Sequence, residues 1–482
     1  MLNIIALSTG RGKTPDFNMY FKAQTLEKGK YSYDKALLGS MKDYVPDSYI
    51  FGYHLTSFGR ELYGKDIWAY MLENVGRNFW KIETFGHSQK KGVNIKTKEL
   101  YNQMMDTLSK RWEEEERKNI ETHPLTSIKK LGKTKRYYTN YSSPKQINDS
   151  TIVAIKTSNF KPTKLVALTR KDKDEEDILS PGRILHSYMD AKDNHLLWSE
   201  LKSHYRWEHE NYSDIFEYDI ETKTYNQITF KKRYYTPAYN PNSLNIIAAV
   251  EDDSINNQHL VIIDKTNGEI IKRFTNEESY SKFSYPSWSK DNSEIYLIKA
   301  NQYGKSLIKY NVYNDKQTTI LPPSFNNISK PLKYKDRLFF IGDYDNTYQV
   351  YSINLNDTSS FLTQHTQSRF GVMDFIIFND SLVLSDYSGD GKTITYQRLI
   401  DIKTIYPSSP FSTFPQADII TKQEDFIFSQ EHIKDTLWKS KKYNKLSHLF
   451  HFHSWAPLYI NAQSQDVNLG VSAFSQNLLG TS

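Results

Sequence analysis

The amino-acid sequence predicts a mainly β fold, a six-bladed β-propeller, together with an N-terminal α-helical domain. Six short runs of β-branched, aromatic and aliphatic residues recur along the middle of the chain. Their starts lie roughly 43 to 50 residues apart, about the length of one four-stranded propeller blade. Aromatic residues make up 14% of the chain and favour β-structure, because flat rings pack well on pleated sheets. Residues 1–125 instead carry apolar side chains at helical spacing.

Each of the six runs is predicted to form one strand of a blade. The runs are Thr151–Ile155, His195–Ser199, Leu244–Ala248, Glu294–Ile298, Arg337–Ile341 and Ser381–Ser385. The strands expected after them are Leu165–Leu168, Ile215–Tyr218, Leu260–Ile263, Leu307–Tyr310, Gln349–Ser352 and Thr393–Tyr396. Polar turns lie between the runs, and their Asp, Asn and Gly residues suit hairpins. A β-sandwich or an open solenoid is the alternative, but sandwich strands recur roughly every 8 to 12 residues.

Composition limits the classes of function. Basic and acidic residues are nearly balanced, 62 against 56, so no nucleic acid partner is predicted. The absence of cysteine excludes disulfides, cysteine-zinc sites and thiol catalysis. No apolar stretch is long enough for a transmembrane helix, and the first residues do not match a signal peptide. The length predicts about three domains: a helical domain over 1–125, the propeller over 140–405 and a C-terminal segment over 406–482.

Three helices are predicted in the N-terminal domain. The first begins near Tyr49 and ends before Gly64, which suits a C-cap, and the second covers about 66–75. The third runs over about 97–117, with four apolar residues on one face: Leu100, Met104, Leu108 and Trp112. The acidic run 113–116 is expected to be a solvated surface.

A proline and an aromatic residue stand before the polar turn and apolar strand of several blades. Tyr285-Pro-Ser-Trp, Thr236-Pro-Ala-Tyr and Lys330-Pro-Leu-Lys-Tyr are the segments concerned. This pattern resembles the repeat of TolB-like, or PD40-type, propellers, and the resemblance covers about 260 residues. The Gly-His and Trp-Asp signatures of WD40 repeats are absent. The resemblance implies the fold more specifically than it implies a function.

The helical domain resembles the C-terminal part of gluzincin-type peptidase domains. The matching pieces are Tyr49-Ile-Phe-Gly-Tyr53, Tyr63-Gly64 and the helices that follow. The chain departs from that family because it contains no His-Glu-x-x-His, which supplies two imidazoles and a carboxylate for zinc hydrolysis. The resemblance therefore implies that a catalytic half would lie upstream of Met1. A helical cap that supports the propeller is the alternative interpretation.

The C-terminal segment begins as a linker, with Tyr406-Pro-Ser-Ser-Pro410. His453-Ser-Trp-Ala-Pro457 and the later Gly470-Val-Ser472 resemble the junction into the outer-membrane β-barrel of Bacteroidetes propeller–barrel proteins. Alternation of Leu469, Val471 and Ala473 fits a first barrel strand. This resemblance implies a truncated barrel and a fragment of a longer, exported protein. A poorly ordered tail is the alternative.

Motifs for catalysis and cofactors are scarce. The sequence holds no Gly-x-Ser-x-Gly, no Walker A loop and no dinucleotide-binding glycine motif. His451 and His453 lack a third ligand at recognisable spacing, so no metal and no cofactor is predicted. The aspartates of 343–345 and 386–390 read as turn formers, with calcium as a minor alternative.

The most suggestive segment for binding is the insertion in the second blade, His204-Tyr-Arg-Trp-Glu-His-Glu210. Inserted loops project from a propeller face, and aromatic residues beside Arg are typical of interaction hot spots. The candidate ligand- or partner-binding residues are His204, Arg206, Trp207, Glu208 and His209. The alternative is that Trp207 plugs the central channel or packs between blades.

The sequence thus predicts a non-catalytic scaffold that binds protein or peptide partners. With the resemblance to propeller–barrel proteins, it would face the periplasm and be held to the outer membrane by a C-terminal barrel. One alternative is a fragment of a zinc metallopeptidase whose propeller filters substrate. The other is a self-contained cytoplasmic scaffold.

Overall fold

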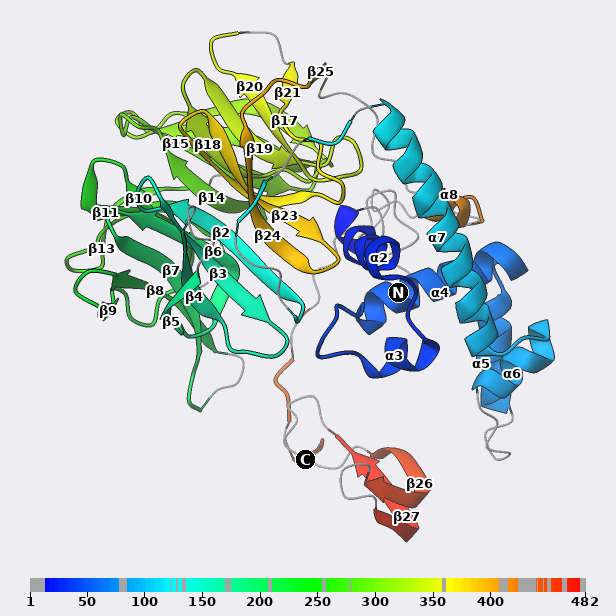
Figure 1. Ribbon diagram of the computed structural model, residues 1–482. Coiled ribbons are helices and arrows are strands. Elements are labelled where there is room, and N and C mark those ends of the chain that lie inside the picture. Colours follow the sequence, from blue (N-terminus) through cyan, green and yellow to red (C-terminus); the bar gives the residue numbers. More distant parts are fainter. Residues whose placement is uncertain are drawn as a thin grey trace. The chain divides into compact units, whose positions relative to one another are not determined.

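The computed structural model describes residues 14–77, 85–122, 124–126, 129–131, 136–169, 175–206, 210–253, 257–276, 278, 280–357, 361–406, 415–423, 439, 441–444, 446–448, 452–461 and 466–476. The chain divides into two compact units, Met1–Ile427 and Phe428–Ser482. The first unit holds a six-bladed β-propeller and a group of helices, as the sequence predicted (Figure 1).

The first four blades are antiparallel sheets of four consecutive strands each. Blade 1 comprises β2 (Thr139–Gln146), β3 (Thr151–Ser158), β4 (Lys164–Thr169) and β5 (Glu175–Leu179). Blade 2 comprises β6 (Ile184–Lys192), β7 (His195–Ser203), β8 (Asn211–Asp219) and β9 (Thr224–Gln227). Blade 3 comprises β10 (Tyr234–Asn240), β11 (Ser243–Asp252), β12 (Gln258–Asp264) and β13 (Glu269–Phe274). Blade 4 comprises β14 (Lys282–Trp288), β15 (Glu294–Asn301), β16 (Gly304–Asn311) and β17 (Gln317–Ser324).

Blades 5 and 6 each take a strand from outside their own repeat. Blade 5 comprises β18 (Ser329–Tyr334), β19 (Arg337–Gly342), β20 (Gln349–Asn354) and β21 (Leu362–Gln364), and β25 (Lys403–Ile405) is its fifth strand. Blade 6 comprises β22 (Val372–Phe378), β23 (Ser381–Ser388) and β24 (Gly391–Arg398). Its outer strand is β1 (Lys129–Lys130), which pairs with β24 and so joins the start of the propeller to its end.

The predicted apolar runs are the second and third strands of the blades, and their side chains are almost all buried. The innermost strands were not predicted, and four of the six contain a proline, which rarely occurs within a sheet. Each innermost strand has a register shift against its neighbour, and in four of them a residue with positive φ stands directly before a proline. These residues are Ser143, Thr236, Tyr285 and Lys330. The proline repeat that resembles TolB therefore marks a β-bulge facing the central channel.

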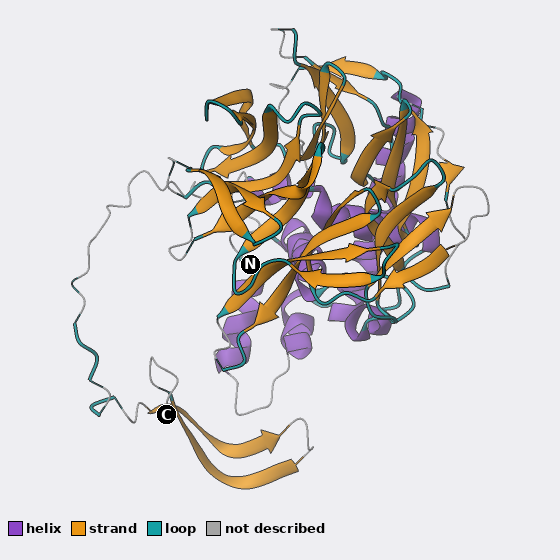
Figure 2. Ribbon diagram, turned by 90° about the vertical axis from the view of Figure 1, so that its left-hand side faces the viewer, coloured by secondary structure: helices purple, strands orange, loops and turns teal. Residues whose placement is uncertain are grey.

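The helices gather on one face of the propeller, which we call the helix-side face (Figure 1 and Figure 2). They are α2 (Pro15–Lys28), α3 (Tyr33–Leu38), α4 (Ser48–Tyr63), α5 (Ile67–Arg77), α6 (Phe85–Val93) and α7 (Thr97–Thr122), with α8 (Pro415–Thr421) packed on α4. Gly64 ends α4 with a φ of 86° and donates its N–H to the carbonyl of Arg60, which confirms the predicted C-cap. The predicted apolar face of α7 is buried from Leu100 to Trp112.

The second unit contains one described hairpin, β26 (Phe452–Asn461) and β27 (Asp466–Ser475). Trp455 and Val471 are 71% and 81% exposed on it. A two-stranded hairpin with large exposed apolar side chains buries little surface of its own, so it is a weak element in water. No helix in the described part of the chain is long and apolar enough to cross a membrane.

Candidate functional site

Helix α2 lies between the propeller and the other helices, and both of its long faces are occupied. Met19 and Ala23 are buried in the core of blades 5 and 6. Phe21 lies on the other side, where its ring meets Trp112 of α7 at 5.2 Å. The hydroxyl of Tyr348 donates to Asp16 over 2.8 Å, and burial raises the pKa of that carboxyl. Positions 16, 19, 23 and 27 share one face of a helix, so the sequence of α2 serves two cores at once.

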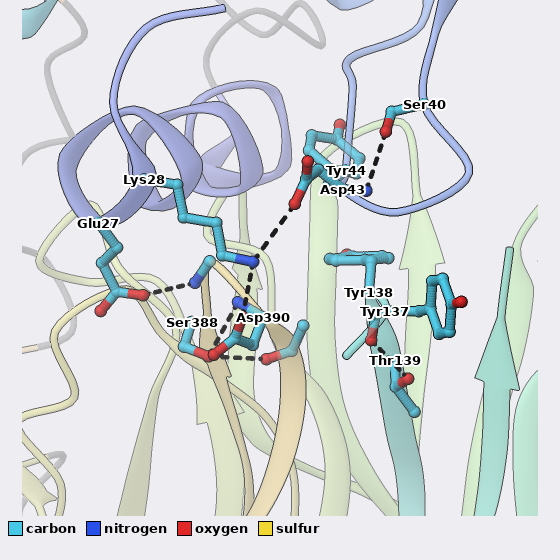
Figure 3. A network of polar contacts seen from close by, with 12 residues as sticks. Glu27, Lys28, Ser40, Asp43, Tyr44, Tyr137, Tyr138, Thr139, Ser388 and Asp390 are labelled. Atoms are coloured by element: carbon cyan, nitrogen blue, oxygen red, sulfur yellow. Dashed lines mark hydrogen bonds and ion pairs between the residues drawn. The ribbon is translucent and has the colours of Figure 1, made fainter. Parts of the chain in front are cut away.

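The C-terminal end of α2 is clamped onto blade 6 (Figure 3). Glu27 accepts the backbone N–H of Gly389 over 2.7 Å, and the Lys28 ammonium lies 2.6 Å from Asp390. Lys28 also reaches Asp43 at 3.6 Å, and the N–H of Tyr138 donates to the carbonyl of Lys42 over 2.7 Å. Gly389 and Asp390 belong to the β23–β24 turn and Tyr138 to the segment before β2, so the bonds to them fix the helices to blades 6 and 1.

Arg369, in the connection between blades 5 and 6, ties two helices to the propeller. Its guanidinium donates to Glu27 of α2 over 2.9 Å and makes two bonds to Glu116 of α7, one of them 3.1 Å long. These carboxylates raise the pKa of Arg369, and the guanidinium also lies 4.7 Å from the ring of Phe370. Glu116 is thus an ion-pair partner, unlike the solvated charge that the acidic run predicted.

A cleft opens beside this clamp, between α2, α7 and the propeller, and we call it the junction cleft. Its larger compartment has a volume of about 470 Å³. Met19, Leu108, Trp112 and Phe370 line it, and all four are 3% to 6% exposed. Charged side chains also line it: Lys22, Arg111, Glu114, Glu115, Lys118 and Arg369. An apolar floor with charged walls and this volume is typical of binding sites.

A smaller compartment of about 270 Å³ continues the junction cleft. The two compartments share Lys22, Thr347 and Arg369, so they meet along one wall. Asp345 lines the smaller one, and burial raises the pKa of its carboxyl to about 6. Asn346 lines the larger one in the left-handed region, with a φ of 65°, and its side-chain Oδ1 is buried without a hydrogen-bond partner.

The central channel is narrow where the inner strands bulge. The space there is about 60 Å³, enough for little more than a water molecule or two. Lys145 pairs with Asp190 over 2.9 Å, and Lys330 pairs with Asp374. The rings of Tyr188 and Tyr285 lie 5.8 Å apart across this space. Ion pairs and aromatic rings fill the waist of the channel, which leaves the junction cleft as the roomier site.

The predicted site lies in the turn between β7 and β8, also on the helix-side face. The N–H of Arg206 donates to Nδ1 of His204 over 3.1 Å, and His204 donates its own N–H to the carbonyl of Glu210 over 2.8 Å. Trp207, Glu208 and His209 lie outside the described residues. None of the described members of this turn lines the junction cleft. Partner binding by the turn stays a prediction.

Three of the aspartates considered for calcium are engaged otherwise. Asp343 accepts the N–H of Asn327 over 2.7 Å, Asp386 accepts the hydroxyl of Ser368, and Asp390 pairs with Lys28. Burial raises the pKa of Asp386 to about 6. Within the described part of the chain, no three His, Asp or Glu side chains are grouped so that they could hold a metal ion.

Sequence reasoning missed the residues of the junction cleft. They come from α2, α7 and two propeller connections that are far apart along the chain. The local signals were Leu108 and Trp112, which the α7 pattern placed on the buried face. Nothing in the sequence around Arg369 indicated that it would meet Glu27 and Glu116.

No family model matches this chain, and no curated protein matches it. Solved structures do. TolB from Acinetobacter baumannii is 14% identical over 54% of this chain and 66% of its own, with a TM-score of 0.39. The β-propeller domain of the Trilobed protease from Pyrococcus furiosus is 13% identical over 55% of this chain and 99% of its own, with a TM-score of 0.37. A prolyl endopeptidase is 9% identical over 56% of this chain and 43% of its own, with a TM-score of 0.36.

The chain spans just under two thirds of that TolB and less than half of that endopeptidase. TolB, whose repeat the sequence resembles, is thus among the similar structures. At such low identity the likeness concerns the propeller fold alone. The links to Bacteroidetes outer-membrane proteins and to a gluzincin remain predictions.

Proposed function

We propose that this protein is a non-catalytic scaffold that binds protein or peptide partners in the junction cleft. The observation that carries the proposal is the cleft itself. It combines a buried apolar floor with charged walls, in which Arg369 is fixed by ion pairs with Glu27 and Glu116. Such a preformed site binds without a large cost for ordering its own side chains.

The chemistry of the cleft supports binding more than catalysis. Its described lining residues include no histidine, the usual general base near neutral pH. Both arginines in its walls are already engaged, Arg369 by Glu27 and Glu116 and Arg111 by Glu61. The sequence adds no nucleophile motif that would compensate.

The proposed location is the periplasmic side of the outer membrane, reached through a C-terminal barrel beyond this chain. It rests on the resemblance of the repeat to TolB and of residues 453–472 to propeller–barrel junctions. Fractionation of source cells with an antibody to the propeller tests it. A band well above 56.5 kDa in the outer-membrane fraction is expected, and a soluble band near 56.5 kDa would exclude it.

The second candidate is a metallopeptidase fragment whose propeller filters substrate. The observation that favours it is the exposure of large apolar side chains on α4 and α5. Tyr49, Leu62, Tyr70 and Leu72 are between 47% and 64% exposed, as on a surface that a further domain covers. A His-Glu-x-x-His motif in the reading frame upstream of Met1 is the discriminating feature.

Site-specific photo-crosslinking in source cells tests the scaffold function. A photo-reactive amino acid replaces Thr347 in the cleft, Tyr205 in the β7–β8 turn, or Asn314 in a turn on the opposite face. We expect protein adducts from position 347 and none from position 314. Adducts from position 205 would add the predicted turn to the binding surface. If only position 314 formed adducts, or none did, the proposal would be wrong.

A further inference from the structure

We propose that His365 is an acid-sensitive latch that holds the fifth strand of blade 5 in place. That strand is β25, and we call residues 400–405, which contain it, the outer strap. Blade 5 has five strands where the other blades have four, so release of the strap bares the edge of β21. An edge with unpaired backbone groups can accept a strand from another chain. The latch does not depend on what occupies the junction cleft.

The outer strap is attached to the propeller through a short ladder and through His365. β25 pairs with β21 over three residues, and the N–H of Ile402 donates to the carbonyl of Gln364 over 2.9 Å. The ring of His365 then reaches the carbonyl of Ile400, which lies 2.8 Å from Nδ1. A ladder of three residues at the edge of a sheet opens easily by itself. The bond to His365 therefore carries a large share of the attachment.

Both ring nitrogens of His365 are used in a fully buried site. His365 is 0% exposed and Ser352, its partner in β20, is 1% exposed. A carbonyl only accepts hydrogen bonds, so Nδ1 carries the proton that is donated to Ile400. In the neutral ring Nε2 then has no proton, and it accepts the hydroxyl of Ser352 over 2.8 Å. Both bonds are satisfied only while the imidazole is neutral.

Protonation of His365 disturbs this arrangement in two ways. A proton on Nε2 turns the bond to Ser352 round and leaves the buried hydroxyl without an acceptor among the described residues. The positive charge of the imidazolium is not balanced either. Asp401 lies 3.3 Å from Nδ1, but Arg337 already binds both of its carboxylate oxygens, over 3.0 and 3.1 Å. A buried charge without its own counter-ion costs free energy, and release of the strap removes that cost.

The surroundings of His365 favour its neutral form. Burial lowers the pKa of its imidazole, and of the two charged groups that face it Asp401 opposes this shift and Arg337 adds to it. Its other described contacts are neutral: the ring of Phe339 lies 4.9 Å away, and Gln397 donates to its backbone carbonyl over 2.8 Å. In the released strap the imidazole regains its ordinary pKa of about 6.5 and binds the proton more readily. The attachment is therefore firm above about pH 6.5 and weakens as pH falls below it.

Thiol labelling measures the release on the full chain, which has no cysteine of its own. Ile405→Cys places one thiol at the end of β25, where the side chain packs against the core of blades 4 and 5. In separate proteins, Asn314→Cys in an exposed turn corrects for the effect of pH on the thiol, and Val250→Cys, at a position 1% exposed in β11, reports global unfolding. Between pH 7.5 and pH 5.5 we expect labelling at position 405 to rise about fivefold relative to position 314, because an ordinary pKa in the released strap allows up to about tenfold. No rise at position 405, or an equal rise at position 250, would overturn the inference.

Two variants, each combined with Ile405→Cys, connect the rise to His365. His365→Gln keeps a side chain that can donate and accept but cannot take up a proton, so labelling should no longer depend on pH. Arg337→Gln leaves Asp401 free to pair with the imidazolium, so the rise should shrink to less than about twofold. A rise in Arg337→Gln as large as in the parent would overturn the inference, and this holds even if His365→Gln does not fold. Thermal unfolding at pH 7.5 checks the folding of both variants.

Asp345 is the competing source of a pH effect on the strap. Burial raises the pKa of its carboxyl to about 6, and it lines the smaller compartment together with Lys403 of the strap. Loss of its charge in acid would weaken the attraction to Lys403 without any part for the imidazole. A rise that persists in His365→Gln would therefore belong to such a group and would overturn the latch.

Discussion

Blades 1–4 and blades 5–6 are built on the same repeat, yet they differ in what surrounds them. The first four blades consist of their own consecutive strands. Blades 5 and 6 take up β25 and β1 and carry the helices through Glu27, Lys28 and Arg369. The apolar strand pattern is the same in both regions. The repeat is therefore sufficient to form the blades, whereas the contacts of the helices with blades 5 and 6 form the junction cleft.

The connection between blades 5 and 6 is also unusually polar for a buried segment. Gln364, His365 and Thr366 are fully buried. Gln364 Nε2 donates to the carbonyl of Thr366 over 2.7 Å, and its Oε1 has no hydrogen-bond partner. The hydroxyl of Thr366 donates to Gln349 over 2.7 Å, and Nδ1 of His365 lies 2.8 Å from the carbonyl of Ile400. Ser368 and Arg369 follow in the same connection, and Arg369 lines the junction cleft.

The largest expected effect is a core truncation far from the helices. Ile247 in β11 is fully buried, and Ile247→Ala should lower the free energy of unfolding by about 3 kcal/mol through lost burial and a cavity. Denaturant unfolding measures the loss. Hydrogen exchange of α2 and α7 in the native state should stay as in the parent, since the buried cluster around Ile247 includes no residue of either helix. Faster exchange in α2 would show that the helices depend on blade 3 as well, and the distinction between the two regions would be wrong.

Arg369→Ala should cost about 2 kcal/mol, because it removes charge-assisted bonds and leaves Glu27 and Glu116 without their partner. Unlike the core truncation, it should speed hydrogen exchange in α2 and α7 and leave β11 unaffected. The matched control is Arg337→Ala, which removes an exposed arginine bound to Asp401 through two bonds of 3.0 and 3.1 Å. A uniform change across all blades would contradict a local clamp.

Asp386 provides a pH test of the same region. Its pKa is raised to about 6 in the folded state by burial, so the folded chain binds a proton before the unfolded chain does. Its contribution to stability is therefore present at low pH and is lost as pH rises through about 6. Between pH 7.5 and pH 5 the parent should gain about 1.4 kcal/mol relative to Asp386→Asn. Equal pH profiles of the two proteins in denaturant unfolding would reject the shift.

The smallest effects should come from ion pairs at the surface. Lys335 and Asp380 are 2.7 Å apart and about two-thirds exposed, so Lys335→Ala should leave the midpoint of thermal unfolding nearly unchanged. Lys28→Ala should cost about 1 kcal/mol, since Lys28 is only 30% exposed and bridges Asp390 and Asp43. Thermal unfolding compares the loss of stability in the two variants. A larger loss for Lys335→Ala than for Lys28→Ala would show that Lys28 does not help to hold α2 on the propeller.

Much of the fold could be predicted because the strands of a propeller are local. The run Glu294–Ile298 and its neighbour Leu307–Tyr310 pair across a short turn, so their alternation and turn residues appear together in the sequence. The innermost strands escaped prediction. In four of them a residue such as Tyr285 adopts a positive φ directly before a proline, a conformation that neither a tyrosine nor a position before proline favours. Only the pairing with the next strand forces that bulge.

The candidate site was largely unpredictable for a related reason. The segment 204–210 stood out by composition, whereas the cleft combines Met19, Trp112, Asn346 and Arg369 from four distant segments. None of these residues is unusual among its neighbours in the chain. Their function depends on which turn the α2 helix docks against.

Local patterns in the sequence were enough to predict the class of fold, the number of blades and the buried face of α7. Each of these depends on a periodic spacing of apolar residues within a few dozen positions, which can be recognised directly in the sequence. The tertiary structure alone decided where the helices attach, how β1 and β25 complete two blades and where a cleft remains open. Those outcomes depend on contacts between residues hundreds of positions apart, such as Arg369 with Glu27, and no local pattern of side chains encodes them.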